Sequence, residues 1–296
     1  NLSSVNTVDV RSQKEFNERA RVASFIGTLQ ASYTDFHFIR EKWQKTTEEE
    51  ALLGVSLAGV ASGSVMSLNL REAAETVVAE NERVAELIGI NKAARTTCEK
   101  PDGNTSCVLG CSSGVHAWHS PYYIRRVKID KSKPIYGYLK DSLPECVEDS
   151  LFKPHTDAYI SLPQKAPEDA IFRTEDPIDT LERIKRLYCD WIIPGHRSGD
   201  ETHNVSATIY VGDGEWDKVA EWMWENRDYY AALSVFPKDN HCYQQMPFTE
   251  CTKEEYNRLS RRLHEIDLNS IVETGDDTEH NGEVACGGGA CELTQV

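Results

Sequence analysis

The fold class is decided by the stretch Leu52-Leu53-Gly54-Val55-Ser56-Leu57-Ala58-Gly59-Val60. It is a compact apolar run that contains glycine and no charged residue. Runs of strand length that are apolar at nearly every position are typical of strands buried on both faces of a sheet. We therefore expect this stretch to form a buried strand of an α/β sheet or barrel.

The segments on either side of this strand carry helix signals. Ser12 and Glu15 form a capping box, and an apolar stripe with helical spacing follows them. Thr47 is followed by three glutamates, which predicts another helix start with acids in its first turn. A long helical pattern begins at Asn69 and ends at Gly89, a residue suited to a helix C-cap.

The rest of the chain alternates between the two kinds of element. Further helices are expected at about 177–193, 215–226 and 253–265, and further strands at about 122–129, 205–211 and 232–236. Residues 131–174 are dominated by prolines and polar side chains, so we expect irregular excursions there. Because strands alternate with helices, the sequence predicts α/β architecture with parallel strands.

A turn-forming stretch lies between two of these elements and reads Lys100-Pro101-Asp102-Gly103-Asn104-Thr105-Ser106. It follows a β-prone run at residues 95–98 and precedes residues 107–110, where we expect a helix to begin. Backbone N–H groups at a helix start lack partners and lie at the positive end of the helix dipole, so such a turn is suited to holding a phosphate. A Pro-Asp-Gly turn is also typical of an ordinary surface loop, and these residues alone leave both interpretations open.

Composition and charge narrow the class of protein. The 296 residues include 48 acidic and 32 basic side chains, and the net charge of −16 argues against an extended nucleic-acid surface. No apolar run is long enough to cross a bilayer, and no signal-peptide pattern opens the chain. Nine cysteines without secretory features indicate reduced thiols in the cytoplasm. The chain begins with Asn1 rather than methionine, and we expect it to be part of a longer protein.

The last residues carry a cysteine pair. An acidic, glycine-containing stretch at residues 273–279 predicts a mobile linker, and it leads to Cys286-Gly287-Gly288-Gly289-Ala290-Cys291. The small residues between the thiols let them meet at disulfide distance. We interpret the pair as a redox shuttle; the alternatives are a metal site with His280 and an incidental pair.

The other cysteines are less informative. One alternative groups Cys98, Cys107 and Cys111 with His116 and His119 in a zinc site, but their spacing matches no common zinc motif. We favour the interpretation that they are small buried residues around the loop, and we predict no metal ligands.

Several stretches together resemble the adenosylcobalamin-dependent (class II) ribonucleotide reductases, in particular the monomeric ribonucleoside-triphosphate type. The order of these stretches along the chain makes the resemblance specific. They are residues 1–6, 25–30, 46–56, 100–106, 111–116, 122–127, 194–196 and 203–208, and the terminal Cys-x4-Cys. The resemblance covers nearly the whole chain but only the C-terminal portion of the family's catalytic subunit.

The resemblance implies a fold. The family has a ten-stranded α/β barrel made of two five-stranded halves around a finger loop. Residues 1–268 would be the C-terminal half of this barrel with irregular insertions, and residues 269–296 a flexible redox tail. Family members carry an Asn-Pro-Cys-x-Glu finger motif, which this chain lacks. The radical cysteine, its glutamate partner and both active-site reducing thiols would therefore lie outside the chain.

The resemblance also implies a reaction: a cysteine thiyl radical, generated from adenosylcobalamin, reduces ribonucleoside triphosphates to 2′-deoxyribonucleotides. Residues 100–106 match the family's substrate-phosphate loop, which reads Lys-Pro-Ser-Gly-Thr, but Asp102 replaces its serine and Asn104 its hydroxyl residue. Cys286 and Cys291 match the family's shuttle pair, which thioredoxin or a similar dithiol resets. The implied partners are the nucleotide, that reductant and the missing N-terminal catalytic segment.

Two alternatives remain. A ribonucleotide reductase large subunit that takes its radical from a separate di-iron subunit also uses a C-terminal cysteine pair, and it needs adjacent tyrosines as an electron relay. The chain contains adjacent tyrosines, at Tyr122-Tyr123 and Tyr229-Tyr230. The second alternative, from a different class, is a nucleotide-binding module without catalysis.

Overall fold

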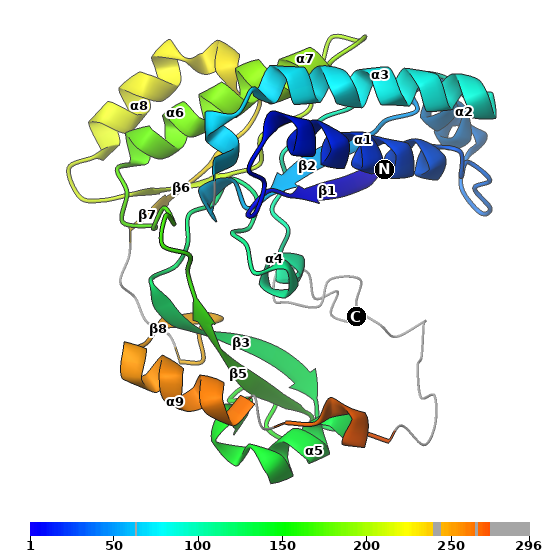
Figure 1. The fold of residues 1–296 in the computed structure, drawn as a ribbon. Helices are drawn as coiled ribbons and strands as arrows, with labels where there is room; N and C mark the ends of the chain where they lie inside the picture. The colour runs from blue at the N-terminus through cyan, green and yellow to red at the C-terminus, as the bar shows by residue number, and fades with distance from the viewer. Residues whose placement is uncertain (63, 239–243, 264–265, 273–296) are drawn as a thin grey trace. The chain divides into compact units, whose positions relative to one another are not determined.

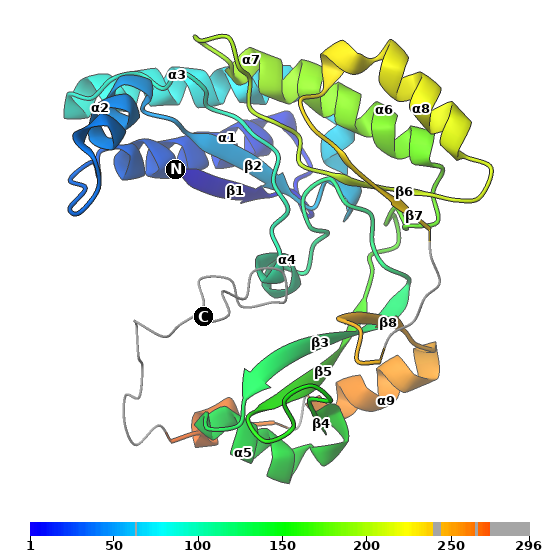
Figure 2. The ribbon, with the colours of Figure 1, turned by 180° about the vertical axis from the view of Figure 1, so that it is seen from behind.

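The computed structural model describes residues 1–62, 64–238, 244–263 and 266–272 (Figures 1 and 2). Internal contacts divide the chain into two compact units. Unit 1 comprises residues 1–118 and 168–239, and unit 2 comprises residues 119–167 and 240–296. Within the described residues, no helix combines the length and the apolar composition needed to span a membrane.

Unit 1 contains parallel strands, as the alternation of elements predicts. The strands are β1 (Leu2–Asn6), β2 (Gly54–Ala58), β6 (Thr208–Val211) and β7 (Ser234–Pro237). β1 pairs with β2, and β6 pairs with β7, both in parallel. Every residue of β2 is buried, which confirms the expected buried strand.

Segment 95–99 joins the two pairs of strands. A parallel bridge links Val55 to Thr97, and another links Glu99 to Val205. Hydrogen bonding therefore runs in the order β1, β2, segment 95–99, residues 205–211 and β7. This order involves five extended segments; that they form half of a barrel stays a prediction.

Helices cover one side of these strands. The helices of unit 1 are α1 (Gln13–Ala31), α2 (Glu41–Glu50), α3 (Leu70–Ile88), α4 (Asn104–Leu109), α6 (Pro177–Leu187), α7 (Ile193–Gly195) and α8 (Trp216–Glu225). Figure 1 shows α1, α3, α6 and α8 on one side of the strands and α4 on the other. The core lies between the strands and the covering helices, where the rings of Phe16 and Trp191 stack with centroids 6.0 Å apart.

Most predicted helix boundaries are confirmed. The Ser12 side chain accepts a hydrogen bond from the Glu15 amide at the start of α1. The Asn69 side chain caps α3, which ends at Gly89 with a φ of +74°. The start predicted at Thr47 is wrong, because Thr47 lies inside α2 and the three glutamates form the C-terminal end of that helix. Acids at this end are unfavourable for the helix dipole, so a prediction from the position of the acids placed the helix start too late.

Within unit 1, the strand face opposite the helices is exposed at β1, β6 and β7, whereas β2 is buried on both faces. Val5, Ile209 and Val211 point into the core, whereas alternate residues on the same strands do not. Leu2 is 62% exposed, and Phe236, which is in register with the exposed Tyr210, is 55% exposed. Parallel sheets are normally covered on both faces, whereas within unit 1 these outer strands are covered on one face only.

Unit 2 is an antiparallel sheet with two helices, and the irregular structure predicted for residues 131–174 is wrong at 134–142, 147–149 and 157–165. The strands follow the order β4 (Val147–Asp149), β5 (Asp157–Lys165), β3 (Tyr122–Asp130) and β8 (Phe248–Glu250), and the helices are α5 (Pro134–Ser142) and α9 (Lys253–Leu263). The prolines fit these elements. Pro134 occupies the first turn of α5, where no intrahelical donor is needed. Pro163 lies in β5 beyond the residues that pair with β4, so its missing N–H breaks no ladder bond.

A small core holds unit 2 together. Ile124, Leu143, Cys146 and Leu259 pack against one another, so α9 and the turn after α5 cover the sheet. The predicted strand at 122–129 is confirmed as part of β3. The predicted linker at 273–279 and the tail cysteines Cys286 and Cys291 lie outside the described residues.

Candidate phosphate-binding site

The predicted phosphate loop, residues 100–106, lies at the carboxyl edge of the parallel strands. It directly follows segment 95–99, and its last residues form the start of α4 at Asn104, earlier than the start expected at Cys107. Ligands of open α/β sheets bind outside the carboxyl ends of the strands, where neighbouring strands diverge. The location therefore agrees with a ligand-binding role.

Segment 95–99 diverges from β2 immediately before the loop. The Leu57 amide donates to Oε2 of Glu99 at 3.1 Å, and the Trp191 indole donates to the Cys98 carbonyl at 3.1 Å. Beyond this point the Glu99 backbone bonds instead to the backbone of Asn204 and Ser206. Side chains thus take the places of ladder bonds where the two strands separate.

Glu99 is a buried acid that sequence reasoning missed. Its side chain is fully buried, and burial raises the pKa of its carboxyl group well above the usual value. Its second oxygen, Oε1, has no hydrogen-bond partner within the described chain. The signal available in the sequence was a charged residue directly after a β-prone run, which a surface turn explains equally well.

The loop is fastened to a second segment at residues 112–114. The amides of Asp102 and Gly103 both donate to Oγ of Ser113, at 3.0 and 3.3 Å. The Gly114 amide donates to Oδ2 of Asp102 at 3.2 Å. Asp102 therefore anchors the loop through its carboxylate, and the expectation that the loop amides are offered to a ligand is wrong for these two.

Other groups of the loop remain available to a ligand. Lys100 is exposed, and its Nζ lies 3.2 Å from Oγ of Ser206 without a carboxylate partner in the described chain. Pro101 and Thr105 are exposed, whereas the Ser106 hydroxyl donates to the Gly103 carbonyl at 2.6 Å. The loop thus presents a cation and a hydroxyl group rather than a ring of free amides.

His116 braces the segment behind the loop. Its Nδ1 lies 3.0 Å from the Ser113 carbonyl, which only accepts, and its Nε2 accepts from the Thr208 amide at 3.1 Å. Nδ1 therefore carries the hydrogen and the ring is neutral. Burial lowers the pKa of His116, which favours this neutral form. His116 thus links the segment at residues 112–114 to the start of β6, and we interpret its role as structural.

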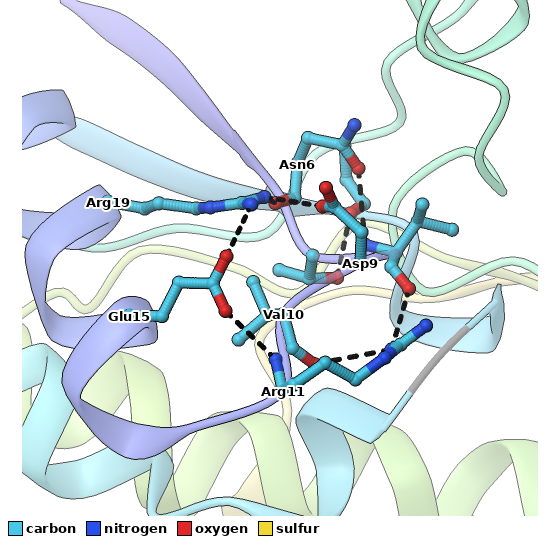
Figure 3. Close-up of polar contacts among 9 residues, drawn as sticks. Asn6, Asp9, Val10, Arg11, Glu15 and Arg19 are labelled. Atoms are coloured by element: carbon cyan, nitrogen blue, oxygen red, sulfur yellow. Dashed lines mark hydrogen bonds and ion pairs between the residues drawn. The ribbon is translucent and has the colours of Figure 1, made fainter.

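Arg19 fixes the turn after β1, at the same edge of the sheet (Figure 3). It pairs with Asp9 and Glu15 at 2.6 and 2.7 Å and donates to the Asn6 carbonyl. The hydrogen bond from Arg19 lowers the pKa of Asp9. Because both carboxylates neutralise the guanidinium, this arginine is occupied by the turn itself.

The cysteines near the loop are buried or partly buried thiols. Burial raises the pKa of Cys98 and of Cys111 to about 12, so both remain protonated at neutral pH. Cys107 is partly buried. In the part of the chain that the structure describes, no three His, Cys, Asp or Glu side chains are grouped to hold a metal ion.

No protein-family model matches the chain. The adenosylcobalamin-dependent ribonucleoside-triphosphate reductase of Lactobacillus delbrueckii subsp. bulgaricus is 25% identical over an alignment of 230 residues, which covers 74% of this chain and 29% of the relative. The protein of the same name from Euglena gracilis is 26% identical over 223 residues, covering 71% of this chain and 28% of the relative.

The fold agrees with these sequence matches. A crystal structure of a B12-dependent, class II ribonucleotide reductase superposes with a TM-score of 0.68, covering 88% of this chain and 40% of that chain at 19% identity. This chain is similar to the class II ribonucleotide reductases. The mixed α/β fold expected from the resemblance is confirmed at this level, and the chain spans 29% of the length of the first relative.

Proposed function

We propose that the chain is the C-terminal part of an adenosylcobalamin-dependent ribonucleoside-triphosphate reductase, which forms 2′-deoxyribonucleotides. The observation that supports this most is the match to reductases of that name across 74% of the chain. The cofactor would supply the radical by homolysis of its cobalt–carbon bond. No residue of the described chain is assigned to binding this cofactor.

In this proposal, residues 100–106 hold the substrate phosphates. The Lys100 ammonium would pair with a phosphate oxygen, and the exposed Thr105 would donate from its hydroxyl group. The anchoring of Asp102 to Gly114 supports this role, because the bond keeps the loop in one shape before the ligand arrives. Its negative charge is a cost of that anchor.

Two substitutions of opposite effect test the loop. Lys100→Ala should weaken binding of inorganic tripolyphosphate by about tenfold, because it removes a charge-assisted contact. Asp102→Asn should strengthen binding, because the amide oxygen still accepts from Gly114 while the like charge beside the phosphate is lost. Isothermal titration calorimetry measures both, with the exposed Lys92→Ala as the matched control. Equal affinities in all three variants would contradict the role of the loop.

The exposed residues on the outer strands of unit 1 suit contact with a further layer of the protein. We propose that the upstream portion of the reductase, with its radical cysteine, covers the face that carries Leu2, Tyr210 and Phe236. The cysteine pair Cys286 and Cys291, outside the described residues, is proposed to carry electrons into that assembled site. Thioredoxin or a similar dithiol would then reduce the pair again.

Turnover tests the proposed reaction. The chain alone should form no deoxynucleotide, whereas the chain combined with the upstream portion should do so only when adenosylcobalamin is present. When adenosylcobalamin is withheld, a di-iron subunit added instead should not restore activity. Turnover by the chain alone would overturn the proposal, and so would activity of the combined protein without adenosylcobalamin. Tripolyphosphate binding without turnover in the combined protein would favour the non-catalytic module.

A further inference from the structure

An open cavity of about 590 Å³ lies at the amino ends of β1 and β2, opposite the edge that carries the phosphate loop. Its volume is within the range of small-molecule sites. Asn1 and Leu52 line one side of it. The other lining residues belong to α2 or immediately precede it: Arg40, Lys42, Trp43, Thr46, Thr47 and Glu50.

The cavity is framed by α2, a helix that buries none of its own residues. Its C-terminal end is fastened to the rest of unit 1: the Ala94 amide donates to the Glu50 carbonyl at 2.8 Å, and the Asn91 side chain donates to the Glu48 carbonyl at 2.8 Å. Trp43, the third residue of the helix, is 60% exposed. The helix thus holds an aromatic ring beside the cavity without packing that ring into the core.

The charges around the cavity favour an anion at one end. Arg40 and Lys42 form no ion pair with any residue that the structure describes, although the chain carries a net charge of −16. Arg40 gives no side-chain cap to α2, so the positive end of the helix dipole adds to these two cations. Glu50 lies at the other end of the helix, and Arg95 neutralises it at 2.9 Å.

Between these ends, α2 presents groups suited to a base and a sugar. Trp43, Thr46, Thr47 and Glu50 recur at helical spacing and share one face. An indole ring stacks well on a nucleobase, and hydroxyl and carboxylate groups bond to ribose hydroxyls. We propose that this cavity binds a nucleoside phosphate, with the base on Trp43 and the phosphates on Arg40 and Lys42. The site is separate from the phosphate loop and does not depend on its role.

Tryptophan fluorescence with adenosine triphosphate as the probe tests the proposal. Titration of the chain should change the emission in a saturable way, and this change should be absent in Trp43→Phe. Arg40→Ala combined with Lys42→Ala should weaken binding by about tenfold or more, because two charge-assisted contacts are lost. The matched control combines Lys14→Ala with Lys45→Ala, which removes the same charge from exposed residues outside the cavity lining. Lys100→Ala should leave the titration unchanged.

The outcomes separate this site from the loop and from general charge effects. A saturable change that survives in Trp43→Phe, or no saturable change in the parent chain, would overturn the proposal. Equal weakening of adenosine triphosphate binding in the cavity double variant and in the control double variant would show attraction by charge alone. This result would also overturn the proposal. So would loss of the signal in Lys100→Ala, which would assign the signal to the loop. Loss of binding in a form extended before Asn1 would show that polypeptide fills the cavity, and this result would also overturn the proposal. Tripolyphosphate should bind here more weakly and leave the Trp43 emission unchanged.

Discussion

Replacement of Gly114 by alanine is expected to weaken tripolyphosphate binding by about tenfold or more and to destabilise the chain by about 2–4 kcal/mol. A Cβ atom there would lie 2.7 Å from the Lys100 carbonyl oxygen and 2.9 Å from Oε1 of Glu99. The residue also has a φ of +55°, which strains any L side chain. Because the first neighbour is backbone, the loop has to move, and Asp102 then loses the amide that anchors it.

Gly110→Ala is the matched control for this substitution. Gly110 has a φ of +64°, but a Cβ atom there meets nothing within 4 Å. It therefore shares the backbone strain without the clash, and it should cost about 1 kcal/mol and preserve the affinity. Urea unfolding measures the free energies of unfolding, and calorimetry measures the affinities. Equal losses of affinity in the two variants would show that the contact between Gly114 and Lys100 does not shape the loop.

Arg183→Met is expected to cost about 3–5 kcal/mol in the free energy of unfolding. Arg183 bonds to Glu175 through both terminal nitrogens, at 3.0 and 2.6 Å, and the two side chains are 8% and 14% exposed. Methionine preserves much of the side chain's bulk but leaves the Glu175 carboxylate buried without its cation. That uncompensated charge, more than the lost attraction, is the cause of the expected destabilisation.

The same helix supplies the control for this prediction. Arg186 pairs with Asp190 at 3.8 Å, and both side chains are more than a third exposed. Solvent screens such a pair, so Arg186→Met should cost about 0–1 kcal/mol. Adding Glu175→Gln to Arg183→Met should recover part of the loss, because it removes the unpaired charge. If urea unfolding shows similar losses of unfolding free energy for Arg183→Met and Arg186→Met, burial of the Arg183–Glu175 pair does not cause the destabilisation.

The sequence predicted well those features that local chemistry determines. The apolar stretch around Val55 became β2, and the caps at Ser12 and Asn69 begin their helices where expected. The loop at residues 100–106 was located correctly between a strand segment and a helix. These features depend on hydrophobic burial and capping, both of which act over a few residues.

The features that depend on distant partners were missed. The prolines of unit 2 suggested irregular structure, and only the strand pairing shows that Pro163 faces an unpaired edge. Glu99 was not singled out from the sequence, and only its bond to the Leu57 amide shows that it is buried within the sheet. Asp102 looked like an unfavourable charge, whereas its bond to Gly114 makes it an anchor. No local pattern encodes these contacts.

The indole of Trp191 between β2 and segment 95–99 has a consequence for the order of folding. The indole donates hydrogen bonds to the carbonyls of Val55 and Cys98. These residues lie 136 and 93 positions from Trp191 in the sequence. Closing loops of this length costs chain entropy before any contact repays it. We therefore expect the junction beneath the phosphate loop to be completed late, after the segment that carries Trp191 has reached the sheet. A ribosome would have to release most of this polypeptide before its candidate binding loop takes shape.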